Sequence, residues 1–474
     1  MPDIEIPKKY RSPKLMVVGD SLAQGCRSLS VSKDLCAQSY GSVLAESQGW
    51  DYIAPTHPQP VVMDVEDIIR RADDLLTFVN IRKRIDKNIQ AWVRTFESPP
   101  SGTSLCFDNV AIAGSTTAQF IGHTAKTWRK EFRDKLATYD KATGLVAKLG
   151  AAGALHFSIN GQFTLNPTGD AAFDDLTQLD WAFARKPETL IVHFGHNDGL
   201  YPIGGYGQIP ESGLAPMKKA YLEGIKQALS APAEIGHLVI ILLPKIGCVA
   251  NLVPEGDRLP DGFYHESYKT VFPYEASIRG KDLAEMDAQI KAINGEARTL
   301  IGPHQAKRRI TVIDTYQVFS KYDFKNTGSP SAQIRIEDAL PIDNRYLEGR
   351  IVPETPLPGG GNLATRPTRT FKQGGFQSID GMHPSAVGYA AFAVELANEI
   401  NLPRNKEAIL KKALKKEKLI TDFPSPLPGF IGLVNLIKDI FDKPDKTEDD
   451  EKTMFIKKAA PICVASIARE FQRR

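Results

Sequence analysis

Cysteine is scarce and scattered in this sequence. Five of the 474 residues are cysteine, an odd number, and no two of them form a Cys-x-x-Cys pair: Cys26, Cys36, Cys106, Cys248 and Cys463. The small, odd number argues against a disulfide framework, and the spacing argues against a zinc site. We therefore expect reduced thiols, as in a cytosolic protein.

Long apolar runs and an excess of charge of one sign are also missing. No stretch approaches the roughly 18 apolar residues that span a bilayer, and the first nine residues hold no apolar run typical of a secretory signal. The 59 Lys and Arg residues nearly balance the 56 Asp and Glu residues, so the net charge indicates no nucleic-acid partner. These absences predict a soluble, cytoplasmic globular protein.

Motifs for metal, phosphate or cofactor binding are absent as well. The sequence contains no His-Glu-x-x-His, no Gly-rich phosphate loop and no Gly-x-Ser-x-Gly elbow of the α/β-hydrolase type. We therefore predict no metal and no organic cofactor.

The sequence does contain an alternation of short apolar runs and amphipathic segments. Unbroken β-rich runs are typical of strands buried on both faces of a parallel sheet, and they occur at residues 15–18, 105–107, 190–194, 238–243 and 310–313. Helical patterns occur at residues 65–79, 128–139, 283–293 and 386–400, the last of them apolar nearly all round. The alternation predicts an α/β domain whose parallel sheet is flanked by helices.

Three regions look like additions to such a core. Residues 26–104 place a helical segment between the first two predicted strands, and residues 320–378 have the Gly- and Pro-rich runs of a long loop or lid. After residue 401 the composition becomes basic and then Pro-rich. We therefore divide the chain into a domain at 1–401 and a C-terminal helical extension at 402–474.

The extension has two interpretations. Its basic segment at 404–418 and its amphipathic segment at 430–441 fit a solvated helix face followed by a helix docked on the protein. Alternatively, the cationic face and the apolar residues after it would hold the protein at an anionic lipid surface. The second interpretation predicts peripheral membrane contact through residues 404–441.

Ser21 follows the first predicted strand, in the run Gly19-Asp20-Ser21. The carboxyl edge of a parallel sheet is where open α/β folds bind their ligands. Gly19 permits a tight turn, and a helix beginning at Ser21 would direct backbone N–H groups toward the site. A serine in this position predicts a nucleophile if a base can take its proton.

A base and a carboxylate occur together much later in the chain, in Asp380-Gly381-Met382-His383-Pro384. The i, i+3 spacing lets the Asp380 carboxylate bond one imidazole nitrogen of His383 while the other nitrogen faces a serine. Because His383 is far from Ser21 in the sequence, only the fold can bring the two together.

Two further blocks offer donors for an oxyanion. Gly114 follows the second predicted strand and has no side chain to block its N–H, and Asn197 follows the third and carries an amide N–H. Three polar residues flank Asn197. We expect His193 to point into the sheet packing, His196 to be the one that could line the site, and Asp198 to bond backbone.

These four blocks, in this order, resemble those of the GDSL, or SGNH-type, serine hydrolases, a family named for the Ser, Gly, Asn and His of its blocks. Here they are Ser21, Gly114, Asn197 and His383. The resemblance implies a flavodoxin-like five-stranded parallel sheet, with Ser21 as nucleophile, His383 as base and Asp380 as its partner. It also implies an oxyanion hole made of the Ser21 N–H, the Gly114 N–H and the Asn197 side chain. The wide spacing of the blocks departs from the compact esterases of the family, and residues 402–474 have no counterpart in it.

We therefore predict a serine esterase or lipase that cleaves a small-molecule or lipid ester through a Ser21 acyl-enzyme. One alternative is an acyltransferase, in which an alcohol replaces water in the second step. The other is a non-catalytic protein that acts at a membrane surface through its extension.

Overall fold

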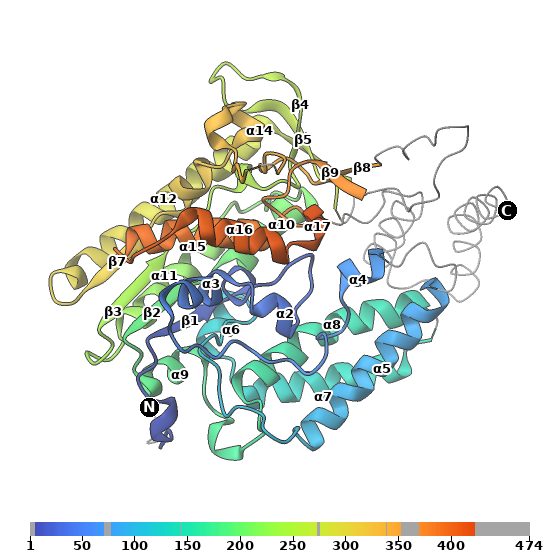
Figure 1. The fold of residues 1–474 in the computed structure, drawn as a ribbon, viewed down its shortest axis with the longest axis vertical. Coiled ribbons are helices and arrows are strands. Elements are labelled where there is room, and N and C mark those ends of the chain that lie inside the picture. Colours follow the sequence, from blue (N-terminus) through green and yellow to red (C-terminus); the bar gives the residue numbers. More distant parts are fainter. Residues whose placement is uncertain are drawn as a thin grey trace.

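A four-stranded parallel sheet lies at the centre of the structure (Figure 1). The computed structural model describes residues 5–70, 77–143, 145–272, 275–337, 339–351 and 369–421. The strands pair in the order β1-β2-β3-β7, and they are β1 (Leu15–Gly19), β2 (Thr189–His193), β3 (His237–Ile241) and β7 (Ile310–Ile313). Both β1 and β3 are buried along their whole length, as unbroken apolar runs predict. The predicted α/β class is confirmed, with four of the five predicted strands.

The fifth predicted strand, at residues 105–107, is wrong. The residues that follow lie along the free edge of β1 instead, where Val17 N donates to Asp108 O at 2.8 Å. Arg185 explains the difference, because its guanidinium binds Phe107 O at 2.6 Å and the Asp108 carboxylate at 2.5 Å. A strand would need that backbone oxygen for its own ladder. Counting this edge segment, the order is the 2-1-3-4-5 of flavodoxin-like sheets.

One face of the sheet is covered by α6 (Thr117–Gly122), α9 (Gln178–Arg185), α11 (Ala215–Leu229) and α12 (Gly280–Gln305). Trp181 of α9, Tyr221 of α11 and Ile290 of α12 share one core with Met16 and Val18 of β1. The helix predicted at residues 283–293 is the middle of α12.

The other face is covered by α3 (Tyr40–Gln48), α13 (Thr315–Ser320) and α15 (Ala386–Glu399). Leu15 and Val17 of β1 point to this side, since successive residues of a strand face opposite ways. Tyr40 of α3 and Phe392 of α15 pack edge to face, with ring centroids 5.0 Å apart. Because α16 covers the side of α15 turned away from the sheet, α15 is apolar nearly all round, as predicted.

A second group of helices, whose core continues to Val387 of α15, lies beside the sheet (Figure 1). It contains α4 (Val65–Arg70), α5 (Thr77–Glu97), α7 (Ala125–Lys141) and α8 (Leu145–Leu165). Trp92, Phe132 and Phe163 are among its buried side chains. The helix predicted at 128–139 lies within α7, whereas the pattern at 65–79 falls on α4, on the start of α5 and on residues 71–76, which are outside the described residues.

Two small antiparallel sheets were not predicted. One contains β4 (Val253–Arg258), β5 (His265–Lys269) and β6 (Ser277–Arg279), and the other β8 (Glu348–Ile351) and β9 (Arg369–Gln373). Their strands are short and mostly polar, so they lack the apolar runs on which the prediction relied. The hairpin β8–β9 falls inside the region expected to be a loop at 320–378, whose Gly-rich run at 356–361 is outside the described residues.

The remaining described elements are short. The helices are α1 (Ser21–Gln24), α2 (Lys33–Cys36), α10 (Leu200–Tyr206) and α14 (Phe324–Thr327). The 3-10 turns are η1 (Lys8–Tyr10), η2 (Ala171–Phe173), η3 (His196–Asp198), η4 (Ile246–Cys248) and η5 (Pro330–Ala332).

After α15 the chain continues into α16 (Lys406–Lys416) and α17 (Lys418–Thr421). Helix α16 lies along α15 (Figure 1), and its sequence is the basic segment noted at 404–418. The amphipathic segment at 430–441 lies outside the described residues. The division of the chain near residue 402 stays a prediction. Within the ranges described above, no helix combines the length and apolar character needed to cross a membrane.

Candidate active site

Ser21 is the first residue after the turn that ends β1. Gly19 makes that turn with a φ of +147°, and a Cβ on it would lie 1.8 Å from His193 O, so only glycine fits. Asp20 follows as the N-cap of α1, and Ser21 is buried. The strand end therefore places the serine at the carboxyl edge of the sheet, where ligands bind in open α/β folds.

Asp380 and His383 form a hydrogen-bonded pair on the loop between β9 and α15. His383 Nδ1 lies 2.7 Å from Asp380 Oδ2, while Asp380 Oδ1 accepts the backbone N–H of Met382 at 2.9 Å and of His383 at 2.8 Å. Both side chains are buried. The i, i+3 spacing thus produces the contact expected from the sequence, and it orients the imidazole.

The surroundings of this pair shift both pKa values. Burial alone would raise the pKa of Asp380, but His383 and the two backbone N–H groups outweigh it and hold that pKa below its usual value. Burial alone would lower the pKa of His383, but the Cys26 sulfur and the Asp380 carboxylate outweigh it and hold that pKa well above its usual value. The arrangement favours an ionised Asp380 and a strongly basic His383.

The segment that begins at Ser21 packs directly against the segment that carries His383. Tyr389 of α15 donates its hydroxyl to Cys26 O at 2.6 Å and approaches Ser21 O at 3.5 Å. Leu29 N donates to Asp380 Oδ2 at 2.9 Å. In the part of the chain that the structure describes, the Ser21 hydroxyl makes no hydrogen bond, and the side chain against His383 is the Cys26 thiol. The fold therefore brings the two segments together.

Gly114 lies just past the edge segment that borders β1. It has a φ of +80°, and a Cβ on it would lie 1.9 Å from the ring of Phe157, which projects from α8. Across the described ranges, neither the Ser21 N–H nor the Gly114 N–H has a hydrogen-bond partner. Both groups are therefore available as donors.

Asn197 lies in η3, after β2, and its amide Nδ2 donates to Ser115 O at 3.0 Å. This bond joins the third block to the residue after Gly114. An amide nitrogen carries two hydrogens, so one remains for another acceptor.

A second acid–histidine pair, which the sequence did not reveal, joins the first block to the third. Asp20 Oδ2 accepts from His196 N at 3.0 Å and lies 2.7 Å from His196 Nδ1. Burial alone would raise the pKa of Asp20, but His196 outweighs it and holds that pKa below its usual value. The pair fixes the residue before the serine to the residue before Asn197. The signal in the sequence was the polar residue beside each block residue, which alone is too common to interpret.

The other two neighbours of Asn197 lie as expected. His193 is fully buried under the sheet face, with Nδ1 3.2 Å from the Tyr40 hydroxyl, and burial lowers its pKa well below the usual value. Asp198 accepts from the backbone N–H and the hydroxyl of Thr117, at 2.8 and 2.6 Å. Among the described residues, no group of three or more His, Cys, Asp or Glu side chains is arranged to hold a metal ion.

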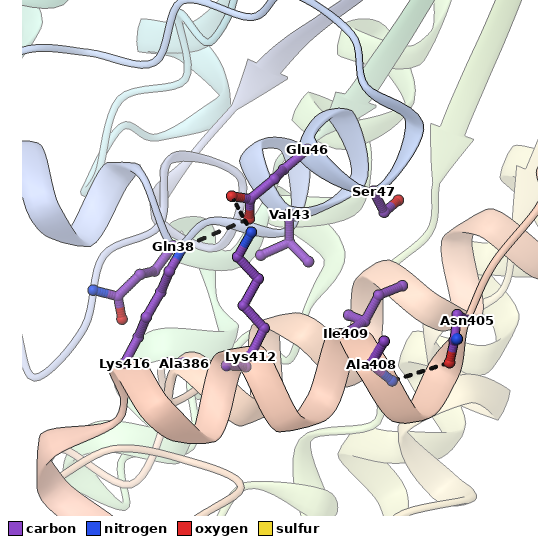
Figure 2. Close-up of a pocket in the computed structure, with 11 residues that line it drawn as sticks. Gln38, Val43, Glu46, Ser47, Ala386, Asn405, Ala408, Ile409, Lys412 and Lys416 are labelled. Atoms are coloured by element: carbon purple, nitrogen blue, oxygen red, sulfur yellow. Dashed lines mark hydrogen bonds and ion pairs between the residues drawn. The ribbon is translucent and has the colours of Figure 1, made fainter.

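An open groove lies between α3 and α16, and none of the candidate site residues lines it (Figure 2). Its volume is about 210 Å³. Val43 of α3 and Ile409 of α16 contribute to its apolar lining, and Lys412 and Lys416 reach across it to Glu46 at 2.6 and 3.5 Å. The groove is therefore a seam between two helices, distinct from the candidate active site.

Comparison with known families gives a match that spans all four blocks. The model of the family described as GDSL-like Lipase/Acylhydrolase matches residues 15–396, which include Ser21, Gly114, Asn197 and His383. No curated protein matches the chain significantly. The family match supports a hydrolase that acts on ester bonds in general. The resemblance noted in the sequence is thereby confirmed, and the chain belongs to the GDSL-like lipase/acylhydrolase family.

Proposed function

We propose that the protein is a serine esterase that cleaves carboxylic esters through a Ser21 acyl-enzyme. The observation that carries the proposal is the buried Asp380–His383 pair, held on a loop that is bonded to the segment beginning at Ser21. A hydroxyl becomes a useful nucleophile only when such an oriented base takes its proton.

In the first half-reaction, His383 takes the proton of the Ser21 hydroxyl as Oγ forms a bond to the ester carbonyl carbon. The C–O bond to the alcohol then breaks, and His383 returns the proton to the departing oxygen. In the second half-reaction, water loses a proton to His383 and attacks the acyl-enzyme. The carboxylic acid leaves, and the proton returns to Ser21. Asp380 stays ionised and stabilises the imidazolium throughout.

The oxyanion formed in each half-reaction would be met by the Ser21 N–H, the Gly114 N–H and the Asn197 amide. The three donors lie at the ends of neighbouring segments of one sheet, and the bond from Asn197 to Ser115 O links two of them. Donors fixed in advance stabilise developing charge without having to reorganise.

Phe157 supports an apolar acyl group for this site. It is 41% exposed, the largest exposure of any large apolar side chain in the described parts of the chain, and its ring covers Gly114. An exposed aromatic ring beside an oxyanion donor would contact the acyl chain of a bound ester. We propose an acyl group longer than acetate, such as that of a lipid ester.

A fluorophosphonate probe tests the assignment, because it reacts with a serine hydroxyl that an adjacent base activates. We expect labelling on the peptide that contains Ser21, and no labelling of the Ser21→Ala protein. The exposed Ser230, whose hydroxyl bonds Gln227 O at 2.7 Å, provides a matched control, and Ser230→Ala should label normally. Since Cys26 lies against His383, Cys26→Ala is a second control. Labelling of Cys26 instead of Ser21 would refute the serine assignment, and labelling of neither would favour a non-catalytic protein.

Product analysis separates hydrolysis from acyl transfer. With an aryl ester as donor, a hydrolase releases the free acid whether or not glycerol or another alcohol is added. Formation of a new ester in place of the acid would overturn the hydrolase assignment and favour the acyltransferase alternative.

A further inference from the structure

In the described part of the chain beyond the family match, an acidic side chain is buried in the interior. Glu417, between α16 and α17, is fully buried. Its Oε2 accepts the backbone N–H of Ala386 at 2.7 Å and lies 3.3 Å from Arg27 Nη1, and its Oε1 accepts Leu419 N at 2.8 Å. Ala386 is the first residue of α15, the helix that follows His383. The amino end of a helix favours an anion, so Glu417 stabilises α15 at the end nearest the base.

Arg27 extends this contact to a second carboxylate. Its Nη2 binds Glu66 Oε2 at 2.8 Å, and Glu66 Oε1 accepts the Ser28 hydroxyl at 2.7 Å. Burial alone would lower the pKa of Arg27, but Glu417 and Glu66 outweigh it and raise that pKa above its usual value. Removing one of the two carboxylates would leave the buried Arg27 charge incompletely compensated and would destabilise the protein. The stability of each of the three charges therefore depends on the other two.

The loop that begins at Arg27 is bonded to the base loop, which is the segment 374–385 between β9 and α15 that carries Asp380 and His383. Leu29 N donates to Asp380 Oδ2, the oxygen that holds His383, and Ser28 N donates to the Ser378 hydroxyl at 2.9 Å. Ser28 and Leu29 have φ values of +51° and +55°, a conformation that non-glycine residues adopt only when their surroundings hold them. They are the two central residues of a tight turn, which Arg27 N to Ser30 O at 3.1 Å and Ser30 N to Arg27 O at 2.8 Å close. The Arg27 contacts to Glu66 and Glu417 anchor the first residue of that turn.

Contacts at the surface hold α16, the helix that ends just before Glu417. Lys412 and Lys416 of α16 bind Glu46 of α3 across the groove (Figure 2). Both lysines are partly exposed, so each contact contributes little stability on its own. Glu417 follows Lys416 directly, however, so these contacts position the end of α16 from which the Glu417 side chain points into the interior.

We propose that Glu417 is a positioning residue for the candidate active site. By binding Ala386 N and Arg27 together, it holds the base loop and the loop after the nucleophile in register, so that Leu29 N stays on Asp380. The structural role stands on the contacts above, whereas its effect on turnover rests on the proposed function.

Turnover by Glu417→Gln is the first test. We expect kcat for an aryl ester to fall on the order of 10- to 100-fold with KM nearly unchanged, the size of effect that small misplacements of a reacting group produce. The matched control is Glu407→Gln on α16, the helix that precedes Glu417, where the carboxylate is exposed and pairs with Lys411 at 2.7 Å. That variant should keep the wild-type kcat. Wild-type kcat in both variants would overturn the proposal.

A second readout does not depend on hydrolysis. An imidazole N–H bonded to a carboxylate gives a low-field proton NMR signal when it is shielded from solvent. Among the described residues two such pairs are buried, His383–Asp380 and His196–Asp20, whereas a third, His123–Glu131, is partly exposed. His383→Gln and His196→Gln assign the two signals. In Glu417→Gln we expect the His383 signal to exchange faster with solvent or to disappear while the His196 signal remains. Two unchanged signals would overturn the proposal.

This readout separates the two ideas. A wild-type protein that cleaves no ester and takes no fluorophosphonate refutes the proposed function, yet loss of the His383 signal in Glu417→Gln would still support positioning. If Glu417→Gln does not fold, the exposed pair Lys412→Ala/Lys416→Ala replaces it. That variant should keep the His196 signal and speed the exchange of the His383 signal; unchanged exchange of both signals would overturn the proposal.

Discussion

The backbone N–H of Leu29 donates to Asp380 Oδ2, the same oxygen that lies 2.7 Å from His383 Nδ1. The two residues are 351 positions apart, so this bond joins a segment near the beginning of the described chain to one in its last third. The bond also removes a lone pair that water would otherwise compete for, which keeps the carboxylate aligned on the imidazole.

The first prediction concerns the base. His383→Ala should lower kcat/KM for an aryl ester by several orders of magnitude, as removal of one member of a cooperating triad does. Adding Ser21→Ala to it should lower the rate little further, because the two side chains act as a unit. A double variant whose losses simply multiply would show that the two act independently.

The second prediction concerns Asn197, the proposed oxyanion donor. Its replacement by alanine should reduce kcat on the order of 100- to 1,000-fold, the usual loss for one donor. Steady-state kinetics on a folded protein measures this. An unchanged kcat would remove Asn197 from the oxyanion hole and leave its bond to Ser115 O as a structural one.

The third prediction concerns pH. The proposed base must be neutral to accept a proton, and the pKa of His383 lies well above its usual value of about 6.5, because the Cys26 sulfur and the Asp380 carboxylate outweigh burial. In the pH profile of kcat/KM, the midpoint of the ascending limb should therefore lie above pH 6.5. Removing the sulfur in Cys26→Ala should lower the His383 pKa and move the limb to lower pH. A limb that does not move would show that the thiol has no influence on the base.

The fourth prediction concerns the acyl group. Phe157→Ala should reduce kcat/KM for long-chain aryl esters on the order of tenfold relative to acetate, because the lost contact acts on the chain and not on the carbonyl. Phe157→Leu retains an apolar side chain and should show a smaller change. Equal losses for acetate and for long chains would place Phe157 outside the acyl site.

The fifth prediction concerns stability. Arg185 binds Phe107 O and the Asp108 carboxylate in the interior, so Arg185→Ala should lower the free energy of unfolding by about 3–5 kcal/mol, the usual cost of stranding one buried charge. Lys226, paired with Glu223 at the surface, is the control, and its replacement by alanine should change that free energy by less than about 1 kcal/mol. Urea unfolding followed by circular dichroism measures both.

The sheet could be predicted because its strands are unbroken apolar runs, which few other structures accommodate. The segment at 105–107 has the same pattern, but the prediction of a strand there was wrong. Arg185, which is far away in the sequence, binds the backbone at Phe107. Strands such as β5, with exposed polar residues, left no pattern to find.

The candidate site shows the same division. The Asp380–His383 contact follows from spacing within one turn, so it could be predicted. The Asp20–His196 pair, the Cys26 thiol and Glu417 depend on contacts between distant segments, and each of these residue types is common at the surface or in turns. Nothing local in the sequence distinguished them.

The three proposed oxyanion donors belong to adjoining segments of one hydrogen-bonded sheet, whereas the proposed base, His383, lies on a loop held by side-chain contacts. Heating should therefore release the loop while the sheet is still intact. Over that temperature interval the protein would keep the circular dichroism spectrum of the folded state and lose its ester hydrolysis. Inactivation would therefore precede melting and would reverse when the sample is cooled.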